Sequence, residues 1–249
     1  MDESILAKTG LAEVIWTALI PNLSSLPPVT DLQESVTLIK TSYPALIKLS
    51  KLWYASLPKR VPLLDKLVRD GVIYAMVFSG DKIRIAEVEL EALELLVNEM
   101  GIYFVKHLKV FPMFNTSNCQ HVIPLISSIL ANPVGFNHPP QLLLALRVLE
   151  TIMRTCWPRI GHHHVEILRG ITLCWRYIRG KESSDLGPVR ESLKMATEIL
   201  VAASPETKVD IAAITSIDSY YAELYQTPDI SRPERDSSTS SLVDPPRTN

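Results

Sequence analysis

Three adjacent histidines, His162, His163 and His164, are the side chains in this sequence that first suggest metal chemistry. Neighbouring side chains on a helix point about 100° apart, so three consecutive imidazoles cannot converge on one ion. Ligands on a helix need a spacing of three or four residues, and here only Glu166, four residues after His162, has it. We therefore predict no metal site and expect a water-exposed start of a helix.

The sequence also lacks the short motifs of common enzyme sites. It contains no GxSxG, GxxxxGK[ST], GxGxxG, HExxH or DDxxD pattern. Carboxylates such as Glu87, Glu91 and Glu94 recur on the polar stripe of a predicted helix, where water should surround them. We predict no catalytic residue, no cofactor and no enzymatic activity. A helical enzyme with an unrecognised site is kept as an alternative.

Charge is distributed unevenly along the chain, which suggests where a partner could bind. Residues 81–99 carry six acidic and two basic side chains, whereas residues 147–181 carry seven basic and two acidic ones. A basic strip with interleaved aromatic side chains suits an acidic protein or nucleic acid. The candidate partner-binding residues are Arg169, Trp175, Arg176, Tyr177 and Arg179. Ordinary solubility charge is the alternative interpretation.

The sequence Trp157-Pro158-Arg159 is the sharpest local pattern. A residue before proline is disfavoured in a helix, so a helix should end here, and the tryptophan ring could fill a groove between neighbouring helices. Arg159 could then bond the last carbonyls of that helix. We predict that these three residues have a structural role.

Helices must position all of these side chains, because helical periodicity dominates the sequence. Polar residues between 84 and 98 recur at steps of three and four, whereas no useful length alternates with a period of two. Thr30 with Gln33 resembles a capping box, and Ser204-Pro205-Glu206 resembles a helix start. We expect about ten helices near residues 3–20, 31–56 (which Pro44 could break), 60–79, 83–100, 101–114, 118–131, 139–156, 160–180, 186–203 and 206–225.

Short connections predict that consecutive helices pack antiparallel. Taken as pairs, the units begin near residues 3, 60, 101, 139 and 186. The spacings between these starts, 57, 41, 38 and 47 residues, scatter around the roughly 40–47 residues of HEAT or armadillo units. The predicted fold is all-α, an α-solenoid of HEAT/armadillo-like antiparallel helix pairs over residues 1–225. A compact helical bundle would give a similar pattern. Residues 226–249, with four prolines and five serines, are predicted to be a disordered tail.

Composition sets limits on the class of protein. The chain has 249 residues, 47% of them apolar, and only nine glycines, which argues against folds that depend on Gly-rich turns. A net charge of −2 makes a nucleic-acid polycation unlikely. No apolar run reaches the roughly 18 residues of a membrane span. Cys119, Cys156 and Cys174 form no CxxC pair, so we expect buried thiols in a soluble, cytoplasmic and nuclear protein.

Several segments resemble the fungal form of the Tel-two-interacting protein two family. The resemblance runs from about Gly10 to Leu200, and its specificity lies in the order of the segments. They are Leu63-Leu64-Asp65-Lys66-Leu67 with Arg69-Asp70-Gly71, Met100-Gly101-Ile102-Tyr103-Phe104-Val105-Lys106-His107-Leu108-Lys109, Pro124-Leu125-Ile126 with Ile129-Leu130-Ala131-Asn132-Pro133, and Cys156-Trp157-Pro158-Arg159-Ile160.

The resemblance implies a helical-repeat scaffold without enzymatic activity. Its partners would be the other helical-repeat subunits of the Triple T complex, Tel two and Tel-two-interacting protein one. Through the Hsp90 machinery, that complex matures and stabilises phosphatidylinositol-kinase-related kinases such as TOR and ATM. The resemblance assigns no binding residues.

Members of this family are generally longer, so the chain would correspond to their C-terminal part or be a truncated gene product. Its first helix would then leave Ile15, Trp16 and Leu19 exposed. The alternative function is a HEAT-type adaptor that binds nucleic acid or cargo through the basic strip of residues 147–181.

Overall fold

The computed structural model describes residues 9–108, 122–181 and 183–225. Every regular element in these ranges is helical, which confirms the predicted all-α class. The α-helices are α2 (Leu11–Leu19), α3 (Leu32–Trp53), α4 (Leu57–Lys66), α5 (Tyr74–Ser79), α6 (Ile83–Met100), α7 (Val122–Leu130), α8 (Pro139–Thr155), α9 (Trp157–Ile160), α10 (His164–Ile178), α11 (Gly187–Ala203), α12 (Thr207–Ile217) and α13 (Ala222–Tyr225). Shorter helical segments connect them, including the 3-10 helices η1 (Ile20–Ser24), η3 (Gly101–His107), η4 (Gly135–Asn137) and η7 (Ser219–Tyr221), and the π-helix η2 (Leu67–Ile73).

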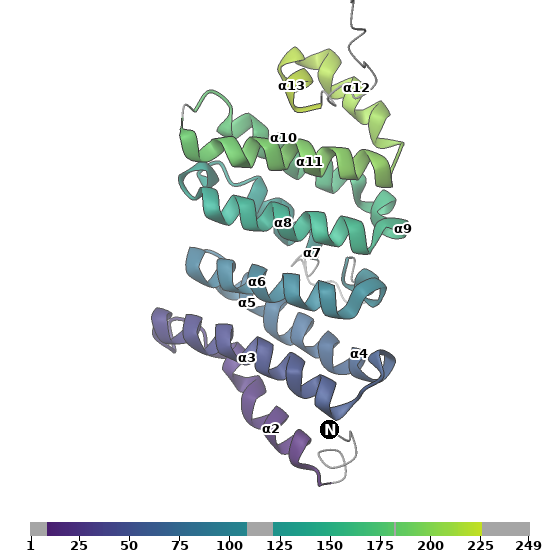
Figure 1. Ribbon diagram of the computed structural model, residues 1–249. Coiled ribbons are helices and arrows are strands. Elements are labelled where there is room, and N and C mark those ends of the chain that lie inside the picture. Colours follow the sequence, from purple (N-terminus) through teal and green to yellow (C-terminus); the bar gives the residue numbers. More distant parts are fainter. Residues whose placement is uncertain (1–8, 109–121, 182, 226–249) are drawn as a thin grey trace, which may run out of the picture.

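The long helices α3, α6, α8 and α11 lie side by side in one layer of an elongated stack (Figure 1). Behind them, α7 packs against α8 and α10, and α10 packs against α11. Helix α2 covers one end of the stack, and α12 and α13 cover the other (Figure 1). The buried apolar side chains form one connected cluster from Ala12 to Leu224. The stack therefore shares a continuous core along its whole described length.

Helix α3 shows how local sequence sets the boundaries. It is unbroken at Pro44, whose side chain is exposed on the solvent side, where water can satisfy the carbonyl that proline leaves free. The predicted capping box of Thr30 and Gln33 is wrong. The Asp31 carboxylate caps the helix instead, and accepts hydrogen bonds from the backbone N–H groups of Gln33 (2.9 Å) and Glu34 (3.3 Å).

The helix ends of the remaining elements depart from the predicted ones by a few residues. Helix α12 begins at Thr207, after a turn at Ser204 and Pro205, and it ends at Ile217 instead of continuing to residue 225. The last residues of the predicted helix 101–114, Cys119, and the predicted disordered tail at 226–249 all lie outside the described residues.

Helix α2, the first described helix, buries Trp16, one of the three residues expected to be exposed. Ala12 and Trp16, one turn apart, face α3, and the Trp16 ring meets the Trp53 ring edge-on with centroids 6.4 Å apart. Ile15 and Leu19 are half-buried against the core, so the expectation of an uncovered apolar face on these residues is wrong. Within the described residues, no helix combines the length and apolar character that a bilayer-crossing segment needs.

A buried polar contact joins α3 to α6 in the middle of this core. The Tyr43 hydroxyl donates to Glu89 Oε2 over 2.8 Å, and both side chains are fully enclosed. The second oxygen, Glu89 Oε1, has no hydrogen-bond partner among the described residues. Burial raises the pKa of Glu89 to about 8, so its carboxyl group is protonated at neutral pH. Burial, and then the Glu89 charge, raise the pKa of Tyr43 well above its ordinary value.

The π-helix η2 brings Gly71 against this contact. A Cβ atom at residue 71 would overlap the Tyr43 hydroxyl and would lie 3.1 Å from Leu23 Cδ1. A π-turn widens a helix locally and interrupts its regular hydrogen bonds. Only glycine lets the widened turn pass the Tyr43 ring at this distance, which explains a glycine within a helical segment.

The first prediction concerns the pH dependence of stability. The Glu89 pKa is about 4.5 in an unfolded chain and about 8 in the folded one. Between these values the folded protein binds more protons than the unfolded chain, so its stability falls as the pH rises from 4.5 to 8. Glu89→Gln keeps an acceptor for Tyr43 but cannot ionise, so we expect the variant to be more stable than wild type by about 4 kcal/mol near pH 8. Near pH 5 the two should be equal.

Urea denaturation at several pH values measures this difference. Glu87→Gln, on the half-exposed face of the same helix, is the matched control and should leave the wild-type pH profile unchanged. A stability difference between wild type and Glu89→Gln that stays constant from pH 5 to pH 8.5 would contradict the assignment.

The second prediction tests the close approach at Gly71. Gly71→Ala should destabilise the protein by about 1–3 kcal/mol, because the new methyl group forces Tyr43 to move. The same substitution in a Tyr43→Phe background should cost less, since the nearest atom is gone. Gly187→Ala, in a helical position with nothing within 4 Å of the added Cβ, should be neutral or slightly stabilising. Equal costs of Gly71→Ala in both backgrounds, measured by urea denaturation, would refute the contact.

Candidate partner-binding surface

The five predicted partner-binding residues do not form one surface. Arg169 and Arg176 are exposed on α10, and Tyr177 is half-buried. Trp175 is only 2% exposed, so its prediction as a contact residue is wrong. Ile171, Trp175 and Ile178 follow the helical period of three to four residues and all face the core, which carries the tryptophan inward.

The end of the basic strip binds other parts of the same chain. The Arg179 guanidinium lies 3.1 Å from the centroid of the Tyr220 ring in η7, and the Lys181 ammonium lies 4.5 Å from the centroid of the Phe136 ring in η4. Both are cation–π contacts that hold connecting segments onto the stack. Of the five candidates, only Arg169 and Arg176 are left as exposed cations, and Arg169 lies 3.7 Å from Glu166 on its own helix.

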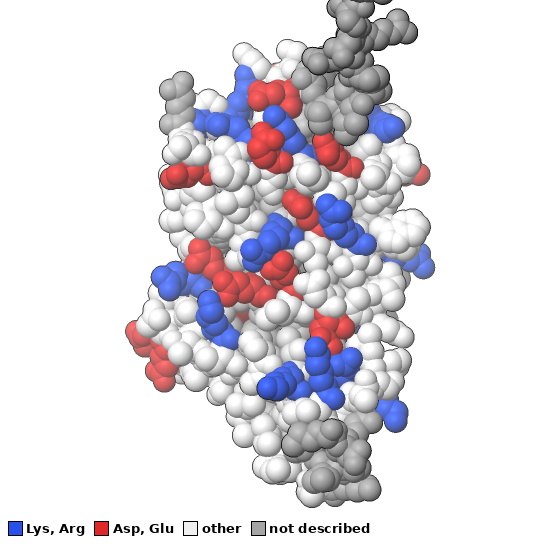
Figure 2. Space-filling model, viewed as in Figure 1, with Lys and Arg blue, Asp and Glu red and all other residues white. Residues whose placement is uncertain are grey.

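The acidic stretch on α6 is neutralised by the helices on either side of it. Arg147 on α8 bonds Glu94 through both Nε (3.0 Å) and Nη2 (2.9 Å). From the other side, Lys40 on α3 lies 3.1 Å from Glu91. Glu99, at the end of α6, bonds Lys51 of α3 (2.6 Å) and Arg60 of α4 (2.8 Å). Figure 2 shows this mixture of red and blue across the middle of the molecule, so the charge asymmetry of the sequence largely cancels between neighbouring helices.

The histidine cluster is also used within the fold. His164 bonds the Gly161 carbonyl through Nδ1 (2.6 Å) and the Asp210 carboxylate through Nε2 (3.0 Å), which ties α10 to α12. Within the described ranges, no three His, Cys, Asp or Glu side chains lie close enough together to hold a metal ion. Cys156 and Cys174 are buried free thiols, and burial raises the pKa of each to about 12, which disfavours the reactive thiolate.

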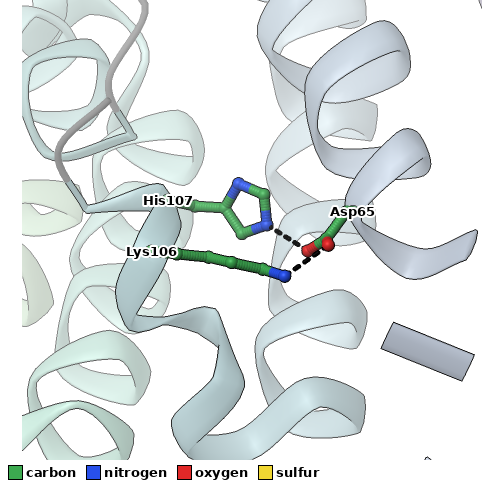
Figure 3. Close-up of polar contacts among 3 residues, drawn as sticks. All are labelled: Asp65, Lys106 and His107. Carbon is green, nitrogen blue, oxygen red and sulfur yellow. Dashed lines mark hydrogen bonds and ion pairs between the residues drawn. The ribbon is translucent and has the colours of Figure 1, made fainter. Parts of the chain in front are cut away.

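A second polar cluster joins α4 to η3 (Figure 3). Asp65 accepts hydrogen bonds from Lys106 Nζ and, over 2.8 Å, from His107 Nε2. His107 is buried beside Phe104, with ring centroids 5.3 Å apart, and this burial lowers its pKa, so the ring is neutral at pH 7. A neutral imidazole enclosed in the core cannot reach a substrate. The cluster fixes the position of η3, and no local sequence pattern indicates it, because Asp65 and His107 are 42 residues apart.

Trp157 is the main departure from the sequence prediction. Its side chain is 63% exposed, so the prediction that the ring is buried between helices is wrong. Cys156 and Ile160, one turn apart, are both fully buried at this corner, which directs Trp157 away from the core. Arg159 is exposed beside it and its guanidinium bonds no described residue, so the predicted contact with the last carbonyls of α8 is also wrong. Pro158 is exposed as well.

Equivalent turns in the stack carry similar side chains. Helices α3, α6 and α8 all end at the edge where α4 and α9 lie (Figure 1). Ile102 and Tyr103, which follow α6, are 52% and 43% exposed, and Leu52, near the end of α3, is also exposed. We call Leu52, Ile102, Tyr103 and Trp157 the turn ridge. Packed helices lie about 8–10 Å apart, so these turns form successive steps along one edge.

Comparison with known proteins agrees with the resemblance seen in the sequence. The Tti2 family model matches residues 1–137, more than half of the 249 residues, from the first described helix to η4. The match includes the Asp65–His107 cluster and three of the four residues of the turn ridge; Trp157 lies beyond it. No solved structure matches this chain. The family match confirms the resemblance to Tel-two-interacting protein two: the chain belongs to the Tti2 family.

Proposed function

We propose that this protein is a non-catalytic scaffold subunit of the Triple T complex, alongside Tel two and Tel-two-interacting protein one. In this proposal the complex works with Hsp90 to mature and stabilise phosphatidylinositol-kinase-related kinases. The family match over residues 1–137 carries the proposal, because membership of the Tti2 family supports a role as a component of that complex.

The architecture is compatible with a scaffold. We propose that the front helices α3, α6, α8 and α11, with the helices behind them, are HEAT-like units of an α-solenoid, a fold whose stacked helices offer extended surfaces to other proteins. The most strongly perturbed acid, Glu89, is sealed inside the core, and the buried His107 is bound to Asp65. Both groups are enclosed in the fold and have no access to a substrate, which supports a protein without enzymatic activity.

The alternative, a HEAT-type adaptor using the basic strip of residues 147–181, receives less support. Its first cation, Arg147, is already bound by Glu94, and its last two, Arg179 and Lys181, lie over the Tyr220 and Phe136 rings. A cation with an internal partner must give up that contact before it can bind phosphate. We also propose a cytoplasmic and nuclear location, for which the buried free thiols Cys156 and Cys174 are the support, because free thiols are typical of reducing compartments.

The third prediction tests membership of the complex. The tagged full chain, purified from its own cells after nuclease treatment, should bring down both Tel two and Tel-two-interacting protein one. Its depletion should lower the amounts of TOR-type and ATM-type kinases without lowering their mRNA, because unassembled kinases are degraded. An unrelated tagged helical-repeat protein is the control. Recovery of neither subunit, or loss of the interaction on nuclease treatment, would contradict the proposal.

A further inference from the structure

We propose that the turn ridge is the docking surface for an acidic segment of a partner subunit. In this arrangement the segment places an apolar side chain against Trp157 and carboxylates beside Lys59 and Arg159. The inference rests on the proposed function, because it assigns a site to the protein–protein contact that a scaffold subunit must make.

The apolar part of the ridge is exposed and rigidly held. Ile102 and Tyr103 lie on η3, whose next residue, Phe104, is fully buried, and whose end is fixed by the bond from His107 to Asp65. Trp157 is held by its neighbour Cys156 and by Ile160, both fully buried. Side chains on a preorganised backbone lose less conformational freedom on binding. Tryptophan and tyrosine are also the residue types that most often dominate binding energy in interfaces.

The charge along this edge indicates what kind of partner fits. The three turns that carry the turn ridge, residues 51–60, 101–108 and 155–162, contain five lysines and arginines and no aspartate or glutamate. The turn after α11 lies on the same edge, beside Gly161, and adds one acidic residue, Glu206. Three of the five cations are bound within the fold, Lys51 and Arg60 by Glu99 and Lys106 by Asp65. Lys59 and Arg159 have no ion pair with any described residue. Arg159 lies two residues after Trp157 and Lys59 lies in the turn that follows Leu52, so both exposed cations belong to turns of the ridge and are free to bind carboxylates.

The opposite edge of the stack differs in charge. Its turns at residues 79–83 and 179–187 hold three basic and three acidic residues, and Lys82 pairs with Asp81. Figure 2 shows mostly blue groups on the edge where α4 and α9 lie, whereas red and blue alternate on the other edge. An acidic segment is therefore attracted to the turn ridge specifically. A second copy of this chain does not fit there, because two ridges facing each other would bring like charges together.

Reconstitution with the two other subunits of the proposed complex tests the site, with the full chain and each purified subunit. Trp157→Ser should weaken binding to one of them by about tenfold or more, as expected for an exposed aromatic at the centre of an interface. The double variant Lys59→Glu, Arg159→Glu should weaken the same interaction by a similar factor and reduce its salt dependence. Because these side chains are exposed, circular dichroism and the urea midpoint should not change.

Matched controls distinguish binding at the turn ridge from non-specific binding by any exposed aromatic or basic side chain. Phe78, 66% exposed near the opposite edge, is the aromatic control, and Lys66, exposed on α4 about 14 Å from its first residue, is the charge control. Phe78→Ser and Lys66→Glu should leave the affinity within about twofold of wild type. Acrylamide quenching of tryptophan fluorescence gives an independent readout, because Trp157 is the most exposed of the four tryptophans, at residues 16, 53, 157 and 175. Its fluorescence should be protected from acrylamide when the partner binds.

The outcomes separate the two proposals. If wild type binds a subunit and Trp157→Ser binds equally well, or if Phe78→Ser weakens binding as much, the turn ridge is not the site and the scaffold function stands. If Arg169→Glu with Arg176→Glu abolishes binding while the ridge variants do not, the interface lies on α10 and the inference is overturned. If wild type binds neither subunit, the proposed function fails and this inference fails with it.

Discussion

The burial of α6 between its neighbours is the constraint on which the rest of the stack depends. Its core face, which includes Leu90, Leu93 and Leu96, is fully enclosed, and the helix contacts α3, α4, α5 and α8. Burial of each leucine contributes about 1.5–3 kcal/mol, which is far more than a surface ion pair contributes. The ion pairs of the acidic stretch on α6 therefore add little to the free energy of folding. Those with Lys40 and Arg147 favour one alignment of the neighbouring helices along α6 over others.

The sequence predicted the helices well and the polar contacts poorly, for a physical reason. A helix follows from the spacing of apolar residues over a few turns, so the positions of α3 and α10 could be predicted from local pattern alone. The direction of Trp175 on α10 was predicted wrongly. The same rule places Trp175 inward with Ile171, and places Trp157 outward once Cys156 and Ile160 are inside. The Tyr43–Glu89 and Asp65–His107 contacts join residues 46 and 42 positions apart, and no local pattern encodes them.

Charge in this sequence has two different uses that the sequence alone does not separate. Cations such as Arg60 and Arg179 have internal partners, Glu99 in one case and the Tyr220 ring in the other, and hold elements together. Lys59 lies directly beside Arg60, and its side-chain ammonium forms no ion pair with any described residue. Adjacent positions on α4 point about 100° apart, so one cation faces the neighbouring helix while the next faces solvent. A count of basic residues therefore overestimates the surface available to a partner.

The turns and the long helices of the stack differ in which substitutions they tolerate. The faces of the long helices are committed to packing, and a substitution there alters both neighbours in the stack. Ile102 and Trp157 lie at turns whose adjacent residues, Phe104 and Cys156, provide the packing, so the contact residue and the core residue are distinct positions in the sequence. Partner specificity can then be altered at the turns with little cost in stability, as long as the buried anchors are kept. This separation lets the exposed side chains of the turns vary while the core of the stack is kept.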